Sequence, residues 1–282
     1  MKNIKPHTLF ISKHSARTCA ARASSLSGLG HKGVFLESRK SFSALKMGSK
    51  GACIPLQSVP LSVLGEALLL DREETEAMGV VLRANPWVKN LEELKEATFK
   101  HMNTQLLALP LEHFRRLHTD LRNLMFTDLY DLFSASKVDY SKLFTFGNMA
   151  AINTTRWASD TEIQVCIFVH LLQALAEVSQ GEPVHVLVLS EDLKFSGMSY
   201  SSQEVLAQEI QKASLKGVIV EIFAKESVCR SEPLYVNFRV EHLMVGGVDT
   251  EDYPNNQARI GHKILSWVIL LLPLGFLGSL LV

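Results

Sequence analysis

The last nineteen residues, Ile264–Val282, form an uncharged and almost wholly apolar run. A helix of this length spans about 28 Å, close to the hydrocarbon thickness of a bilayer. Arg259 and Lys263 precede the run and can reach lipid headgroups, and Trp267 falls near the same interface. The run therefore predicts a transmembrane helix that anchors the chain in a lipid bilayer. The alternative is a buried C-terminal helix, although a core helix usually keeps one polar stripe.

Charge is unevenly distributed, although the formal net charge of the 282 residues is zero. Residues 1–50 carry ten basic side chains and one acidic one, whereas the rest of the chain carries 19 basic and 28 acidic side chains. An acidic body repels nucleic-acid phosphates, so no nucleic-acid partner is expected. Residues 1–55 are also rich in serine, which is typical of a mitochondrial transit peptide. The alternative is a basic, disordered tail that only contacts anionic lipid.

Within this arm, Phe10–Leu26 can form an amphipathic helix, because small apolar side chains recur there at helical spacing. The segment Gly28–Gly33 then matches the pattern G-x-G-x-x-G. That pattern binds a dinucleotide only where it follows a strand and opens a helix. The segment before Gly28 does not have the composition of a buried strand, and the segment after Gly33 does not have that of a long helix. We therefore expect no cofactor here.

The body begins with helices. The apolar pattern predicts one helix over Ser62–Met78 that ends at Gly79. Ser159 and Glu162 have the spacing of a capping box, so we expect a helix to begin there. The residues that follow are apolar on nearly all sides, which is typical of a buried core helix.

A β-α-β unit follows. Val184–Leu189 and Val218–Phe223 are β-branched apolar runs that predict strands, and a helix from about Ser202 to Lys216 lies between them. Strands joined by a helical crossover should be parallel. Leu234–Val240 alternates between apolar and polar side chains, which predicts a further strand with one solvated face.

These patterns predict an α+β or α/β fold. It has a helical N-terminal half, a small and partly parallel sheet with a β-α-β unit, and a C-terminal transmembrane helix. The predicted divisions are a disordered arm or targeting segment (1–55), a globular body (56–245), a polar stalk (246–263) and the membrane anchor (264–282).

Few residues suggest a catalytic or metal-binding role. The four cysteines are far apart and form no C-x-x-C pair, so we expect no metal site. Cys166 and His170 share one face of the predicted core helix, but no further ligand is evident, and core packing is the better interpretation.

The best candidate for a ligand site is the loop over residues 190–201. It leaves the carboxyl end of a predicted parallel strand and enters a helix N-terminus, where anions are favoured. Its candidate ligand-binding residues are Ser190, Asp192, Lys194 and Ser199. The chain contains neither G-x-x-x-x-G-K-[ST] nor G-x-S-x-G, so no catalytic residue is assigned.

The sequence leaves two functions open. The favoured hypothesis is a non-enzymatic adaptor, tail-anchored in an intracellular membrane, that holds protein partners. The alternative is a membrane-bound enzyme that acts on a small anionic or lipid-like ligand at the 190–201 loop. The basic arm favours a mitochondrial membrane, with the endoplasmic reticulum as the alternative.

Overall fold

A seven-stranded sheet forms the centre of the computed structural model, which describes residues 7–37, 45–48, 51–104, 108–134, 139–144, 148–179, 182–189, 198–225 and 238–242. The strand order is β3-β4-β2-β5-β6-β1-β7, and each neighbouring pair runs parallel. The strands are β1 (Thr8–Ile11), β2 (Lys32–Glu37), β3 (Leu45–Lys46), β4 (Met149–Asn153), β5 (Val184–Leu189), β6 (Val218–Ala224) and β7 (Arg239–His242).

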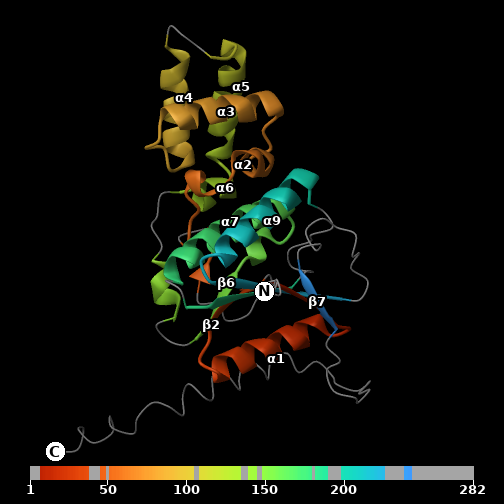
Figure 1. Cartoon of the computed structure of the whole chain (residues 1–282). Helices are drawn as coiled ribbons and strands as arrows, with labels where there is room; N and C mark the ends of the chain where they lie inside the picture. Colours follow the sequence, from red (N-terminus) through yellow and green to blue (C-terminus); the bar gives the residue numbers. More distant parts are fainter. Residues whose placement is uncertain are drawn as a thin grey trace, which may run out of the picture. The chain divides into compact units, whose positions relative to one another are not determined.

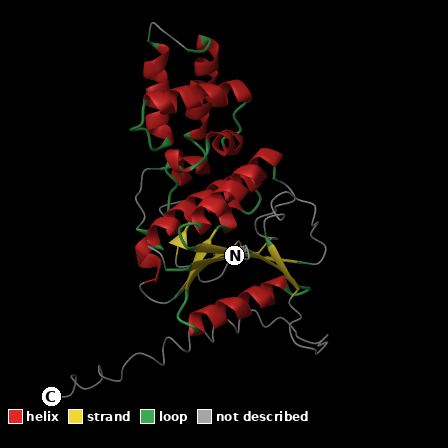
Figure 2. Cartoon of the chain, in the orientation of Figure 1, coloured by secondary structure: helices red, strands yellow, loops and turns green. Residues whose placement is uncertain are grey.

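Different helices cover the two faces of this sheet (Figures 1 and 2). Helix α1 (Ser15–Gly28) lies against one face, and α7 (Thr161–Val178) and α9 (Tyr200–Ser214) lie against the other. Strands buried on both faces read as nearly continuous apolar runs, as β5 and β6 do apart from His185 and Glu221. The smaller core, beneath α1, contains the stacked rings of Phe10 and Phe223, whose centroids are 4.9 Å apart.

Five further helices form what we call the helical module, residues 61–132 (Figure 1). Its first helix packs against α7 and α9, and the longer helices pack on one another farther from the sheet. The helices are α2 (Leu61–Ala67), α3 (Arg72–Ala84), α4 (Leu91–Met102), α5 (Leu111–Leu124) and α6 (Asp128–Leu132). Short 3-10 turns occupy Leu56–Ser58, Tyr140–Phe144 and Thr155–Trp157.

The predicted β-α-β unit is confirmed. β5 pairs in parallel with β6, with Val184 opposite Val218 and Leu189 opposite Phe223, and α9 connects them. The sheet itself is larger than predicted and is parallel between all described neighbours. Of the predicted strand 234–240, only the last residues are described, and β7 begins at Arg239.

Residues 8–37, within the segment expected to be a disordered arm or targeting segment (1–55), contain β1, α1 and β2. β1 lies between β6 and β7, and β2 lies between β4 and β5. The predicted helix within the arm does form, as α1, but its apolar side chains pack on the sheet. The pattern G-x-G-x-x-G spans the end of α1 and the start of β2, so it does not open a helix.

The helix predicted over Ser62–Met78 is two helices. The chain turns at Leu69, which has a positive φ of 58°, and α3 begins after Asp71. The Asp71 side chain accepts from the Glu74 amide at 2.8 Å, and the Glu74 carboxylate accepts from the Asp71 amide at 2.8 Å. This capping box starts a new helix at a point where the periodic spacing of apolar residues shows no break. Gly79 therefore lies inside α3 and does not end a helix.

Two predicted helix starts are displaced by one or two residues. The N-cap of α7 is Asp160, which accepts from the Ile163 amide at 3.0 Å, in place of the predicted Ser159. The N-cap of α9 is Ser199, which accepts from the Ser202 amide at 3.1 Å. In both cases a neighbouring polar residue competes for the same free amides.

Helix α7 is the core helix that its composition predicted. Among the described residues it is the one helix long and apolar enough to cross a membrane, but 67% of the relevant window is buried inside the protein. A buried core helix meets the same length and composition criteria. The predicted stalk (246–263) and anchor (264–282) lie outside the described residues, and a C-terminal transmembrane helix is not shown.

Candidate functional site at the carboxyl edge of the sheet

The carboxyl ends of the parallel strands bring several connections to one edge of the sheet. β1 leads into α1 on one face, whereas β5 leads through residues 190–197 into α9 on the other. Ligands of open parallel sheets bind outside the carboxyl ends of the strands. This edge is therefore the place to look for a site.

The turn between β1 and α1 is short and polar. β1 ends at Ile11 and α1 begins at Ser15, so three residues connect them. The buried hydroxyl of Ser12 accepts from the His14 amide and from Thr18 Oγ1, both at 3.2 Å, and its own amide donates to the Ala224 carbonyl at 3.0 Å. These bonds hold the turn against the end of β6. The side chains of Lys13 and His14 remain exposed.

The N-terminus of α1 is electrostatically open. His14 at the N-cap makes no side-chain hydrogen bond to the helix, and the first turn holds no acidic residue. In contrast, α3, α4, α7 and α9 are capped by Asp71, Asn90, Asp160 and Ser199. The amides at a helix N-terminus carry a partial positive charge, which a cap or a carboxylate normally offsets. At α1 that charge is reinforced by an exposed lysine.

The predicted ligand loop is only partly described. Ser190, Asp192 and Lys194 lie outside the described residues, and Ser199 lies within them. Besides capping α9, the Ser199 hydroxyl donates to Glu66 Oε2 at 2.8 Å. Ser199 therefore stands at the predicted edge, but its hydroxyl already has partners within the protein.

Glu66 and Glu162 meet at this helix start, and the sequence did not identify them. Ser201 Oγ donates to Glu66 Oε1 at 2.7 Å, and Ser202 Oγ donates to Glu66 Oε2 at 2.9 Å. Ser202 Oγ also makes a short contact with Glu162 Oε2. In the sequence, the signal for this polar cluster was the group of serines at the start of α9. Glu66 comes from α2, more than a hundred residues away, and no local pattern connects the two segments.

The two carboxyls have opposite pKa shifts. Burial raises the pKa of Glu162, and the nearby Glu66 carboxyl adds to this effect, although hydrogen bonds from Ser202 and Ser199 oppose it. Burial also acts to raise the pKa of Glu66, but hydrogen bonds from Ser201, Ser199 and Ser202 outweigh burial and lower it. Carboxyls with diverging pKa values divide into a proton donor and a proton acceptor.

Cys166 and His170 do not form a reactive pair. Cys166 is fully buried, and burial raises the pKa of its thiol well above the ordinary value. The imidazole of His170 lies 2.9 Å from the Tyr140 hydroxyl and 3.0 Å from Ser58 Oγ. Both ring nitrogens thus have partners from the protein. No group of three or more His, Cys, Asp or Glu residues within the described ranges could hold a metal ion.

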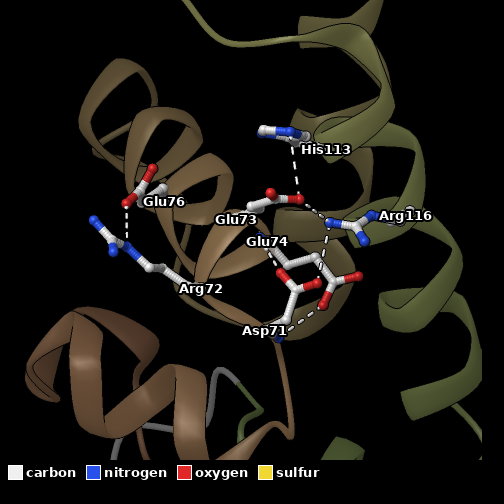
Figure 3. A network of polar contacts seen from close by, with 7 residues as sticks. All are labelled: Asp71, Arg72, Glu73, Glu74, Glu76, His113 and Arg116. Atoms are coloured by element: carbon white, nitrogen blue, oxygen red, sulfur yellow. Dashed lines mark hydrogen bonds and ion pairs between the residues drawn. The ribbon is translucent and has the colours of Figure 1, made fainter.

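A second polar cluster joins α3 to α5 (Figure 3). The Arg116 guanidinium lies 2.6 Å from Glu73 Oε2 and 3.0 Å from Asp71 Oδ2, and His113 Nε2 lies 3.5 Å from the same Glu73 oxygen. Arg116 is on α5 and both carboxylates are at the start of α3. The cluster therefore neutralises acidic residues near a helix N-terminus and ties two helices of the module together. It lies away from the sheet edge.

Comparison with known proteins gives a fold but no family. No protein-family model matches the chain, and no curated protein matches it either. The chain resembles the solved structure of VirB4 of Thermoanaerobacter pseudethanolicus, with a TM-score of 0.59 and 11% identity over 82% of this chain and 73% of that one. The unbound bacterial conjugative coupling protein TrwB matches at 10% identity over 85% and 69%, with a TM-score of 0.46.

The likeness to VirB4 shows the fold alone, and it overturns several predictions. The non-enzymatic, tail-anchored adaptor and its membrane-bound alternative are contradicted. Mitochondrial or endoplasmic reticulum membranes are likewise contradicted, and neither a transit peptide nor a tail anchor is supported. The physical reason is visible in the arm, because its basic and apolar residues build β1, α1 and β2.

Proposed function

We propose that this chain binds a phosphate-bearing ligand of the nucleotide class at the carboxyl end of β1. The observation that carries the proposal is the open N-terminus of α1, which lacks a side-chain cap and an acidic residue in its first turn. Lys13 and His14 lie exposed beside it. Anions are stabilised at such a helix end by the amides and by the helix dipole.

The position of β1 in the sheet also supports a phosphate-bearing ligand. β1 is flanked by β6 and β7, and α1 leaves toward the face opposite α9. A fold of the P-loop ATPase type adds support, since its phosphate loop follows a strand and opens a helix. The three residues between β1 and α1 cannot form an eight-residue phosphate loop. We therefore expect modest affinity, supplied by the helix end and Lys13.

The residues that follow β5 in the sequence are proposed as further ligand-binding residues. β5 and β1 are separated by β6 alone, so their ends are about 10 Å apart. Ser190, Asp192 and Lys194 follow β5 directly in the sequence. A carboxylate there could hold Mg²⁺ against a bound phosphate, because Mg²⁺ sites combine one or two carboxylates with substrate oxygens.

Calorimetric titration of the full chain with Mg·ATP, pyrophosphate and AMP tests the proposal. Lys13→Ala should weaken ATP and pyrophosphate binding about fivefold, which corresponds to roughly 1 kcal/mol for an exposed charge contact. Lys216→Ala is the matched control, because Lys216 is also exposed but precedes β6 at the opposite edge. Equal affinities of the two variants, or no binding of ATP and pyrophosphate by the native chain, would refute the assignment.

A further inference from the structure

Glu66 and Glu162 come from separate parts of the fold and meet at the start of α9. Glu66 is the sixth residue of α2, at the base of the helical module, and Glu162 is the second residue of the core helix α7. Ser199, Ser201 and Ser202 provide the hydroxyls between them. Three helices are thus joined at one small polar cluster, directly after the 190–197 connection.

The hydrogen atoms of this cluster do not suffice if both carboxyls are ionised. The Ser202 hydroxyl has one hydrogen, yet its oxygen lies within hydrogen-bond distance of Glu66 Oε2 and of Glu162 Oε2. An ionised carboxylate only accepts hydrogen bonds, so both contacts of the Ser202 oxygen contain a hydrogen only when one of the two carboxyls carries a proton. A proton on Glu162 supplies the missing hydrogen of the Ser202–Glu162 contact: Glu162 donates to Ser202 Oγ, and Ser202 donates to Glu66.

The surrounding charges favour the same arrangement. Glu162 Oε1 accepts only the long 3.4 Å bond from the Ser199 amide, whereas Glu66 accepts from the three hydroxyls. Among the described residues, Cys166 of α7 is a titratable group whose pKa responds to both carboxyls, and it supplies no positive charge. No described cation contributes to the pKa of either carboxyl, so a second negative charge has no described counter-charge.

We propose that Glu66 and Glu162 share one proton and form a pH-sensitive latch between the helical module and the carboxyl edge of the sheet. Below the pKa of Glu162 the latch is closed by the shared proton. Above that pKa two carboxylates face each other, and α2 separates from the start of α9. The raised pKa of Glu162 agrees with this direction. The proposal does not depend on a phosphate ligand.

The position of the latch gives its opening a structural consequence. Directly after Glu66 the chain turns at Leu69, whose φ of 58° is unfavourable for a residue with a side chain. The Leu70 amide closes the turn on the Gly65 carbonyl at 2.9 Å. Release of Glu66 would therefore loosen the joint from which α3 and the rest of the module extend.

Hydrogen exchange of the full chain, measured from about pH 5 to about pH 9 and corrected for intrinsic exchange, tests the latch. In the native protein, opening of α2 and of the first turn of α9 should rise by up to about tenfold per pH unit above the pKa of Glu162. Glu162→Gln supplies a neutral side chain that can still donate a hydrogen bond. It should remove this rise.

Glu112→Gln is the matched control, because Glu112 is likewise the second residue of a helix but lies exposed beside Arg115. It should leave the native pH dependence intact. As a measurement that does not require a variant to fold, infrared spectra of the native chain over the same pH range should show the carbonyl stretch of a protonated carboxyl, and this band should disappear where hydrogen exchange rises. A native profile without a pH-dependent rise, an unchanged rise in Glu162→Gln, or absence of that infrared band would overturn the proposal.

Discussion

The guanidinium of Arg22 on α1 donates hydrogen bonds to both carboxylate oxygens of Glu221 on β6, at 2.7 and 2.9 Å. Glu221 is 1% exposed, and its Oε1 also lies 2.8 Å from His185 Nδ1. The pair therefore fixes α1 to the face of the sheet that carries the smaller core. It also explains how a carboxylate can stand in the middle of an otherwise apolar strand.

Replacing Arg22 should destabilise the fold. Arg22→Met leaves a buried carboxylate without its cation, and we expect a loss of about 2 kcal/mol in the free energy of unfolding, a discounted figure because the Arg22 side chain is partly exposed. Urea denaturation measures this loss. Arg17→Met, an exposed arginine on the same helix, is the control. Similar stabilities of the two variants would show that the pair contributes little.

Acid should destabilise the protein through His170. Burial lowers the pKa of His170 from 6.5 to about 4, so the folded protein binds this proton less readily than the unfolded chain. The stability contribution is therefore complete above pH 6.5 and is lost as the pH falls toward 4. Between neutral pH and about pH 4.5 the loss should be on the order of 2 kcal/mol.

His170→Gln should reduce this acid dependence, whatever its effect on stability at neutral pH, and the part that remains should come from His7, whose pKa burial also lowers to about 4. Denaturant unfolding at a series of pH values measures the slope. His14→Gln serves as the control, because His14 lies exposed at the start of α1. If the full slope survives in His170→Gln, another group must cause the acid sensitivity.

The start of α7 gives a test of cap position. Asp160→Ala removes the oxygen that accepts from the Ile163 amide and should cost about 1 kcal/mol. Ser159→Ala should have almost no effect, because Ser159 is exposed and lies outside the cap. Thermal or urea unfolding distinguishes the two. A larger loss in Ser159→Ala would restore the capping box that the sequence predicted.

Local patterns predicted the local elements well. The β-α-β unit was predictable because its strands and helix are consecutive and each has its own periodicity. The break between α2 and α3 was not, because Asp71 and Glu74 cap a helix inside an apolar pattern that continues without interruption. Several adjacent polar residues can each serve as the N-cap of a helix, so residue spacing alone does not determine where the helix begins.

The larger errors concern contacts between distant segments. β1 has four residues, too few for a convincing strand pattern, and its partners lie at the other end of the chain. Arg22 looked like part of a basic arm because Glu221 is 199 positions away. The Glu66–Glu162 pair was missed for the same reason, because its two residues are far apart in the sequence. Its serines are visible in sequence, but nothing near them indicates Glu66.

The place of β1 between β6 and β7 sets the order in which the sheet can be completed during synthesis. β1 is translated before both of its neighbours, which follow more than 200 residues later. Until then β1 has neither neighbour to pair with, and α1 lacks β5 and β6, two of the strands that it covers. Pairing over such separations slows folding and prolongs exposure to aggregation. β1 is thus translated early but paired late, and deletion of residues 1–11 would leave β7 without its described partner.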